Sequence, residues 1–190
     1  MAGLAEQVLS RSPEKFSLAG FSMGGHVAME IMRRAPHRVK RLALIDTRAD
    51  VDSPERLRLR ERDARLVQDG GFEALAAQLP DRWMSATHAA ESTLRERLLR
   101  MVRAVSDDTR QEQLAALLTR IDSRPFLPII TCPTLVMCGR QDAPNPVWMH
   151  EEMVALIPGA TLRVIEDCGH LSPIEQPDAV SDALRDWLRW

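Results

Sequence analysis

The segment Gly20-Phe21-Ser22-Met23-Gly24-Gly25 separates a β-type run from a helical pattern. Residues 15–20 form a short, mostly apolar run of the kind found in strands, and the run ends in glycine. Apolar residues then recur at helical spacing from Met23 to Met32. The sequence therefore predicts a strand, a sharp turn at Ser22 and a helix.

The rest of the chain continues this alternation of strand and helix. The apolar run at residues 41–46 suits a strand that is covered on both faces. Strands that alternate with helices form an open parallel sheet, so the fold class is α/β, with about four parallel strands and flanking helices. The other expected elements are strands at residues 134–138 and 161–166 and helices at residues 147–156 and 177–190.

Residues 53–124 differ from the remainder, because they are rich in Arg, Glu, Leu and Ala with helical periodicity. Ser53 before a proline and Ser106 before two acidic residues are typical of helix starts. We expect residues 1–52 and 125–190 to form an α/β core, and residues 53–124 to form a helical insertion.

Composition argues against several classes of protein. The chain has 25 Lys and Arg residues against 27 Asp and Glu residues, and its net charge of −2 gives no electrostatic reason to expect nucleic acid. No apolar run approaches the roughly 18 residues of a membrane-spanning helix, so no membrane partner is expected. Three cysteines and a start without a secretory signal favour a cytoplasmic protein with reduced thiols.

The predicted turn gives Ser22 the surroundings of a nucleophile. Small residues two positions before and after it, Gly20 and Gly24, would let the strand and helix backbones pass close together. The helix N-terminus would point at the hydroxyl, and the Met23 backbone N–H would be free to stabilise negative charge in an oxyanion hole. An ordinary glycine-rich loop before a helix is the simpler alternative.

A serine nucleophile needs an imidazole to take its proton and a carboxylate to orient that imidazole. Asp142 follows the third predicted strand, and His170 follows the fourth. Loops at the carboxyl ends of parallel strands share one edge of the sheet, so both side chains can reach Ser22. Asp46, at the end of the second strand, is the alternative acid.

The remaining histidines and cysteines receive structural interpretations. His26 lies one helical turn beyond the serine and is interpreted as buried or as a helix cap, and His37, His88 and His150 are expected at the surface. No second ligand accompanies His150 at metal-binding spacing, so no metal is expected. Cys168 is interpreted as a small packing residue.

Three segments resemble the α/β-hydrolase fold family, in its serine-nucleophile branch with a helical cap: Gly20–Gly25, Cys132–Asp142 and Cys168–Pro177. The resemblance covers nearly the whole chain. It implies that Ser22 is the nucleophile, His170 the base and Asp142 the acid, and that residues 53–124 form a cap over the pocket. In some members the acid follows the preceding strand, which keeps Asp46 as an alternative.

The resemblance departs from the family at the start of the chain. Members usually place about four strands before the nucleophile strand, whereas 21 residues precede Ser22 here. We expect the N-terminal half of the sheet and the loop with the second oxyanion donor to be absent. The strand at residues 15–20 would then have an open edge, which favours a homodimer, a complementing N-terminal fragment or marginal stability.

Several functions follow from these residues. The leading hypothesis is a serine hydrolase that cleaves a small ester, thioester or similar acyl substrate through an acyl-serine intermediate, without a metal or organic cofactor. One alternative is an impaired fragment or pseudoenzyme that acts through protein interaction. Another is an acyltransferase, lyase or C–C bond hydrolase with the same three residues. The substrate stays undefined, with Trp83, Met84 and Phe126 among the candidate pocket residues.

Overall fold

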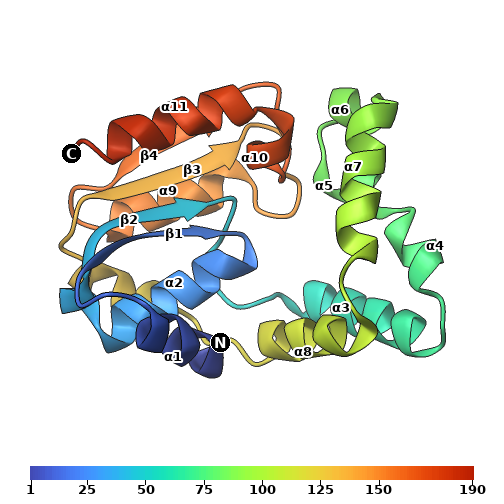
Figure 1. Ribbon diagram of the computed structural model, residues 1–190, viewed down its shortest axis with the longest axis horizontal. Coiled ribbons are helices and arrows are strands. Elements are labelled where there is room, and N and C mark those ends of the chain that lie inside the picture. Colours follow the sequence, from blue (N-terminus) through green and yellow to red (C-terminus); the bar gives the residue numbers. More distant parts are fainter.

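The computed structural model describes residues 1–190 and contains one parallel sheet in the order β1-β2-β3-β4 (Figure 1). The predicted fold class, α/β with four parallel strands and flanking helices, is confirmed. Each observed strand begins and ends within two residues of the expected one. The strands are β1 (Phe16–Phe21), β2 (Val39–Ile45), β3 (Thr134–Gly139) and β4 (Thr161–Ile165).

Helices connect and cover the strands. The helix that follows Ser22 ends just before Pro36, which cannot continue an α-helix. The bounds are α1 (Ala2–Arg11), α2 (Met23–Arg34), α9 (Val147–Leu156), α10 (Ser172–Glu175) and α11 (Pro177–Trp187), with 3-10 turns η1 (Pro36–Arg38) and η2 (Arg124–Ile129). No helix in the chain combines the length and the apolar character that crossing a bilayer requires.

The two faces of the sheet form two separate apolar cores. Leu42 and Leu44 of β2 belong to a core shared with α1, α2 and α9. Ala43 and Ile45, which alternate with them, belong to a second core under α11. Because side chains alternate between the faces of a strand, covering both faces requires the continuous apolar run seen in the sequence. In β3 all six residues are buried.

A set of helices between residues 54 and 118, hereafter the helical insertion, lies beyond the carboxyl ends of the strands (Figure 1). Ser53 and Ser106 cap two of its helices by accepting backbone N–H groups, as expected. The insertion has its own core, which includes Leu171 from the chain segment after β4. Its helices are α3 (Pro54–Gln68), α4 (Phe72–Ala76), α5 (Leu79–Trp83), α6 (Ala86–Ala90), α7 (Ser92–Arg103) and α8 (Asp107–Leu118).

Strand β1 lies at an edge of the sheet and pairs with β2 alone. Its exposed and half-buried residues alternate along most of its length, whereas β3 is buried throughout. Ser17 and Ala19 are exposed on one face of this strand. One side of β1 therefore carries backbone groups without strand partners.

Glycines around Ser22 permit close contact between strand, helix and sheet. A Cβ atom at Gly20 would lie 2.4 Å from the carbonyl oxygen of Gly24, and one at Gly25 would lie 2.4 Å from Oγ1 of Thr47. A Cβ atom at Gly24 would meet no atom within 4 Å. The expectation that a small residue is needed two positions after the serine was therefore wrong: it is Gly25 that packs against the end of β2.

Alanine substitutions distinguish the tightly packed Gly20 from Gly24, which has free space beside it. Gly20→Ala should lower the free energy of unfolding by about 1–3 kcal/mol, because the new methyl group meets backbone atoms that have no room to move. Gly24→Ala should leave it unchanged or raise it by up to about 1 kcal/mol, because alanine is the better helix residue. Urea denaturation followed by circular dichroism measures both values. Equal stability of the two variants would contradict this packing.

Candidate active site

Ser22 occupies the junction between β1 and α2 in a strained conformation. Its φ of 48° and ψ of −112° fall outside the regions that L-residues favour. The Ser22 N–H donates to the Ile45 carbonyl at 2.8 Å, and the Thr47 hydroxyl donates to the Ser22 carbonyl at 2.9 Å. Hydrogen bonds to the last residue of β2 and to Thr47 just beyond it thus hold the serine backbone in its unfavourable geometry.

Three side chains that are distant in the sequence lie within hydrogen-bond reach of one another. The Ser22 Oγ atom is 2.9 Å from Nε2 of His170, and Nδ1 of the same ring is 2.9 Å from Oδ2 of Asp142. Asp142 and His170 are buried. A carboxylate only accepts hydrogen bonds, so Nδ1 carries the proton and Nε2 is free to accept the serine O–H. The structure thus brings together the three residues that were singled out in the sequence.

The loops that carry Asp142 and His170 are fastened to each other. The Gln141 N–H donates to the Cys168 carbonyl, and the Cys168 N–H donates to Oε1 of Gln141, both at 2.7 Å. A Cβ atom at Gly139 would lie 2.0 Å from the carbonyl oxygen of Gly169, so only glycine fits where the two loops cross. This mutual support fixes the distance between the acid and the imidazole.

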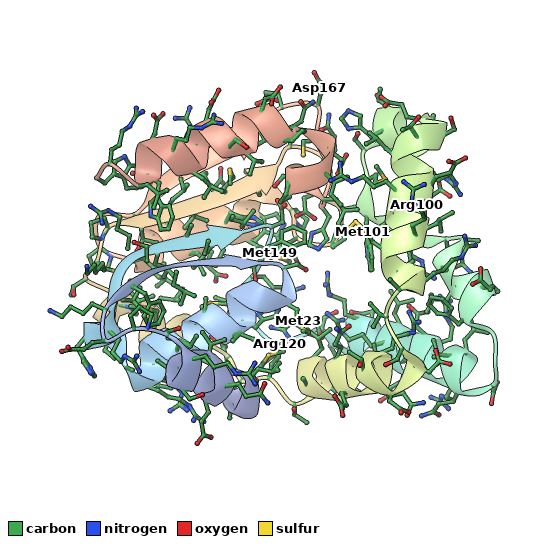
Figure 2. All side chains as sticks on the ribbon, viewed as in Figure 1. Met23, Arg100, Met101, Arg120, Met149 and Asp167 are labelled. Carbon is green, nitrogen blue, oxygen red and sulfur yellow. The ribbon has the colours of Figure 1, made fainter.

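Met23 begins α2 immediately after the serine. The first N–H groups of a helix lack acceptors within the helix, and the helix dipole makes this end positive. The Met23 N–H is therefore available to a negatively charged oxygen near Ser22. Figure 2 labels Met23 at the start of α2.

The sequence model of the alpha/beta hydrolase family matches residues 2–183, nearly the whole chain. The chain belongs to the α/β-hydrolase family.

Several similar α/β hydrolases have been described. A solved structure of a thermophilic esterase from Thermogutta terrifontis is 35% identical, with a TM-score of 0.88 over 99% of this chain and 69% of that chain. A 3-oxoadipate enol-lactonase from Acinetobacter baylyi is 27% identical over 88% of this chain and 61% of its own length. A pimeloyl-[acyl-carrier protein] methyl ester esterase from Aliivibrio salmonicida is 26% identical over 98% and 73%.

Asp46, the alternative acid, has other partners in this α/β hydrolase. Its Oδ1 accepts the Gly139 N–H at 3.1 Å, and its Oδ2 accepts the backbone N–H and the hydroxyl of Ser172 at 3.1 and 2.6 Å. Burial raises the pKa of the Asp46 carboxyl to about 7, although His170 and Ser172 act in the opposite direction. The structure places Asp142, rather than Asp46, against the imidazole.

The other histidines lie outside this cluster. His26 is buried, as expected. Its pKa is lowered to about 3, mainly by burial and further by the positive charges of Arg120 and Arg60. His37 is exposed, but the expectation of a surface position for His150 was wrong. His150 is fully buried and its Nε2 accepts the Thr47 N–H at 3.2 Å; burial lowers its pKa to about 4. The histidine accepts from a backbone N–H that lies more than 100 positions away, so its own neighbours in the sequence carry no signal for this role.

Sequence reasoning gave no role to Glu175, although it lies in a quoted segment. Its side chain has no exposed surface, and its Oε2 accepts the N–H groups of Ser85 and Gly169 at 2.8 and 2.9 Å. Its Oε1 accepts the Leu171 N–H at 3.0 Å. Four residues separate His170 from this carboxylate in the sequence, and no pattern in that short segment signals its contacts.

The candidate pocket residues separate into two groups. Trp83 of the helical insertion lies near the imidazole of His170, with ring centroids 6.5 Å apart. Met84 is buried in the core of the insertion. Phe126 instead lies beside Arg33, whose guanidinium carbon is 5.7 Å from the centre of the phenylalanine ring. No group of three or more His, Cys, Asp or Glu side chains is arranged to hold a metal ion.

Proposed function

We propose that this α/β hydrolase cleaves a small ester, thioester or similar acyl substrate through an acyl-serine intermediate. The observation that carries the proposal is the hydrogen-bonded series Ser22–His170–Asp142, with both contacts at 2.9 Å. Nucleophile, base and orienting acid in this order perform covalent acyl transfer on several unrelated folds.

Acylation is the first step. The Ser22 Oγ atom attacks the substrate carbonyl carbon while Nε2 of His170 takes the hydroxyl proton. Asp142 holds the ring in place and stabilises its positive charge. The carbonyl oxygen becomes an oxyanion, which the Met23 N–H binds. His170 then donates the proton to the leaving alcohol or thiol as its bond to carbon breaks, which leaves the acyl group on Ser22.

Deacylation repeats the same proton movements with water. A water molecule attacks the acyl carbon while Nε2 of His170 takes one of its protons. The second tetrahedral intermediate collapses, the bond between carbon and the Ser22 oxygen breaks, and His170 returns the proton to that oxygen. The products are a carboxylic acid and the alcohol or thiol, and the enzyme regains its starting state.

The helical insertion acts in this proposal as a cap over the pocket, within the residue range 53–124. Its position beyond the carboxyl ends of the strands supports this role (Figure 1). The carbonyl of Trp83 accepts the His170 N–H at 2.6 Å, so the insertion reaches the residue that moves the protons. A cap at this place would shape the acyl-binding space and exclude water.

The named relatives agree with ester chemistry, since two are esterases and one is a lactonase. Transfer of the acyl group to an alcohol, and cleavage of a C–C bond, use the same nucleophile and base and stay as alternatives. Product analysis with a competing alcohol acceptor distinguishes transfer from hydrolysis, because transfer yields a new ester.

Ester hydrolysis by matched variants tests the proposal. With p-nitrophenyl acetate, Ser22→Ala should lower kcat by at least about 10⁴-fold, because the nucleophile that forms the acyl intermediate is lost. Asp142→Asn should lower kcat by about 10⁴-fold, because the wrong ring nitrogen would carry the proton. Ser10→Ala changes an exposed serine and serves as the control. Full activity in folded Ser22→Ala would refute the acyl-serine mechanism.

A second proposal concerns the open edge of the sheet. A groove of about 490 Å³ runs between α1, β1 and α2, and most of its lining residues are apolar, among them Leu4, Val8, Leu18 and Val27. An unpaired strand beside an apolar groove favours pairing with another strand. We infer that a second copy of this chain covers the edge, with a complementing N-terminal fragment as the alternative partner.

Sedimentation velocity at increasing protein concentration tests this inference. The chain should shift from monomer to dimer as its concentration rises, because a second β1 edge satisfies the free backbone groups. Leu18→Lys, which places a charge in the groove, should weaken the dimer. A monodisperse monomer that melts cooperatively in calorimetry at every concentration would contradict the dimer.

A further inference from the structure

The backbone N–H groups around His170 are each taken by a specific acceptor. Glu175 accepts those of Gly169 and Leu171, and Oδ2 of Asp46 accepts that of Ser172. The N–H of His170 itself donates to the Trp83 carbonyl. Four consecutive amides, residues 169–172, are thus fixed by two buried carboxylates and one carbonyl of the helical insertion.

Glu175 also binds the helical insertion directly. Its Oε2 accepts the Ser85 N–H at 2.8 Å and lies 3.1 Å from Nδ1 of His88. Ser85 caps α6 with its own hydroxyl, so the contact is made at a helix start. A Cβ atom at Gly169 would lie 2.5 Å from the Ser85 nitrogen, which shows how closely the two segments pack.

These donors explain how a charged side chain is tolerated in the interior. The Glu175 side chain is completely buried, and no arginine or lysine pairs with it. A buried carboxylate is costly unless hydrogen bonds replace its hydration. Here those bonds come from both sides: two from the histidine loop, defined as residues 169–172, and two from the insertion residues Ser85 and His88. One carboxylate therefore connects the two segments.

We propose that Glu175 is the positioning residue that fixes the orientation of His170 and couples the histidine loop to the helical insertion. The inference rests on the proposed function, in which His170 is the base. Displacing the insertion would remove the Trp83 and Ser85 contacts together and loosen the loop that carries the imidazole. The site is then competent only while the insertion is docked on this loop.

Glu175→Gln is a sharp test because it changes few atoms. An amide oxygen in the place of Oε2 keeps the acceptor for Ser85 and Gly169, but the amide nitrogen then faces the Leu171 N–H. Donor would oppose donor next to His170. Misplacement of a catalytic group by about 1 Å can cost about 100-fold in rate, so kcat should fall by about 10- to 100-fold. KM should stay near the wild-type value, since Glu175 does not touch the substrate.

The experiment compares wild type, Glu175→Gln, His88→Ala and Glu166→Gln in the full chain. Glu166 is an exposed carboxylate paired with Arg140, so its variant is the matched control. Rates with p-nitrophenyl acetate give kcat and KM. Proton NMR of the low-field His170 Nδ1–H signal reports the bond to Asp142 without turnover. That signal should shift or disappear in Glu175→Gln and stay unchanged in Glu166→Gln.

The outcomes separate this inference from the proposed function. If the wild-type chain shows no ester hydrolysis, the proposed function fails, and the NMR signal alone decides the role of Glu175. A folded Glu175→Gln protein with the kcat and the His170 signal of the Glu166→Gln control would overturn the inference. If Glu175→Gln does not fold, the His88→Ala variant decides the question. In His88→Ala, a decrease in kcat of less than about 10-fold together with a shifted His170 Nδ1–H signal supports the coupling. Wild-type values of both kcat and this signal in His88→Ala refute the coupling.

Discussion

The hydrogen bond between Ser22 Oγ and Nε2 of His170 is the contact on which the proposed chemistry of this α/β hydrolase depends. It joins residues that are 148 positions apart, so it exists only because β1 and β4 are in one sheet and their following loops meet at one edge. The chain holds unfavourable backbone at this edge: Ser22, Asp46 and Asp167 have φ values of 48°, 47° and 50° and each follows the carboxyl end of a strand. Such strain persists where the surrounding structure enforces it.

Three buried carboxylates near this edge take different roles because they receive different donors. Asp142 faces the imidazole of His170. Asp46 accepts hydrogen bonds from Gly139 and Ser172. Glu175 accepts hydrogen bonds from the histidine loop and from the helical insertion. The role of each carboxylate therefore depends more on the hydrogen-bond donors around it than on its residue type. Burial raises the pKa of Asp46 to about 7 against the opposing effect of its Ser172 donors, whereas Asp142 lies against the imidazole.

The sequence predicted much of this arrangement, for identifiable physical reasons. The strands were predictable because a sheet covered on both faces requires continuous apolar runs, and Ser53 and Ser106 were predictable as helix caps. Asp142 and His170 were predictable because they follow parallel strands. The buried state of His150 and the contacts of Glu175 were not, since each depends on which backbone groups arrive from distant segments. Gly25, rather than Gly24, packs on Thr47 for the same reason: the end of β2 comes from elsewhere in the chain.

The hydroxyl of Ser22 becomes reactive through His170 in this mechanism. Treatment of the folded chain with a fluorophosphonate, followed by mapping of the adduct by peptide mass spectrometry, tests this reactivity. We expect one adduct, on the peptide that contains Ser22, and a much slower reaction in His170→Ala. An adduct on another serine, such as Ser85 or Ser172, or an equal rate without the imidazole, would contradict this mechanism.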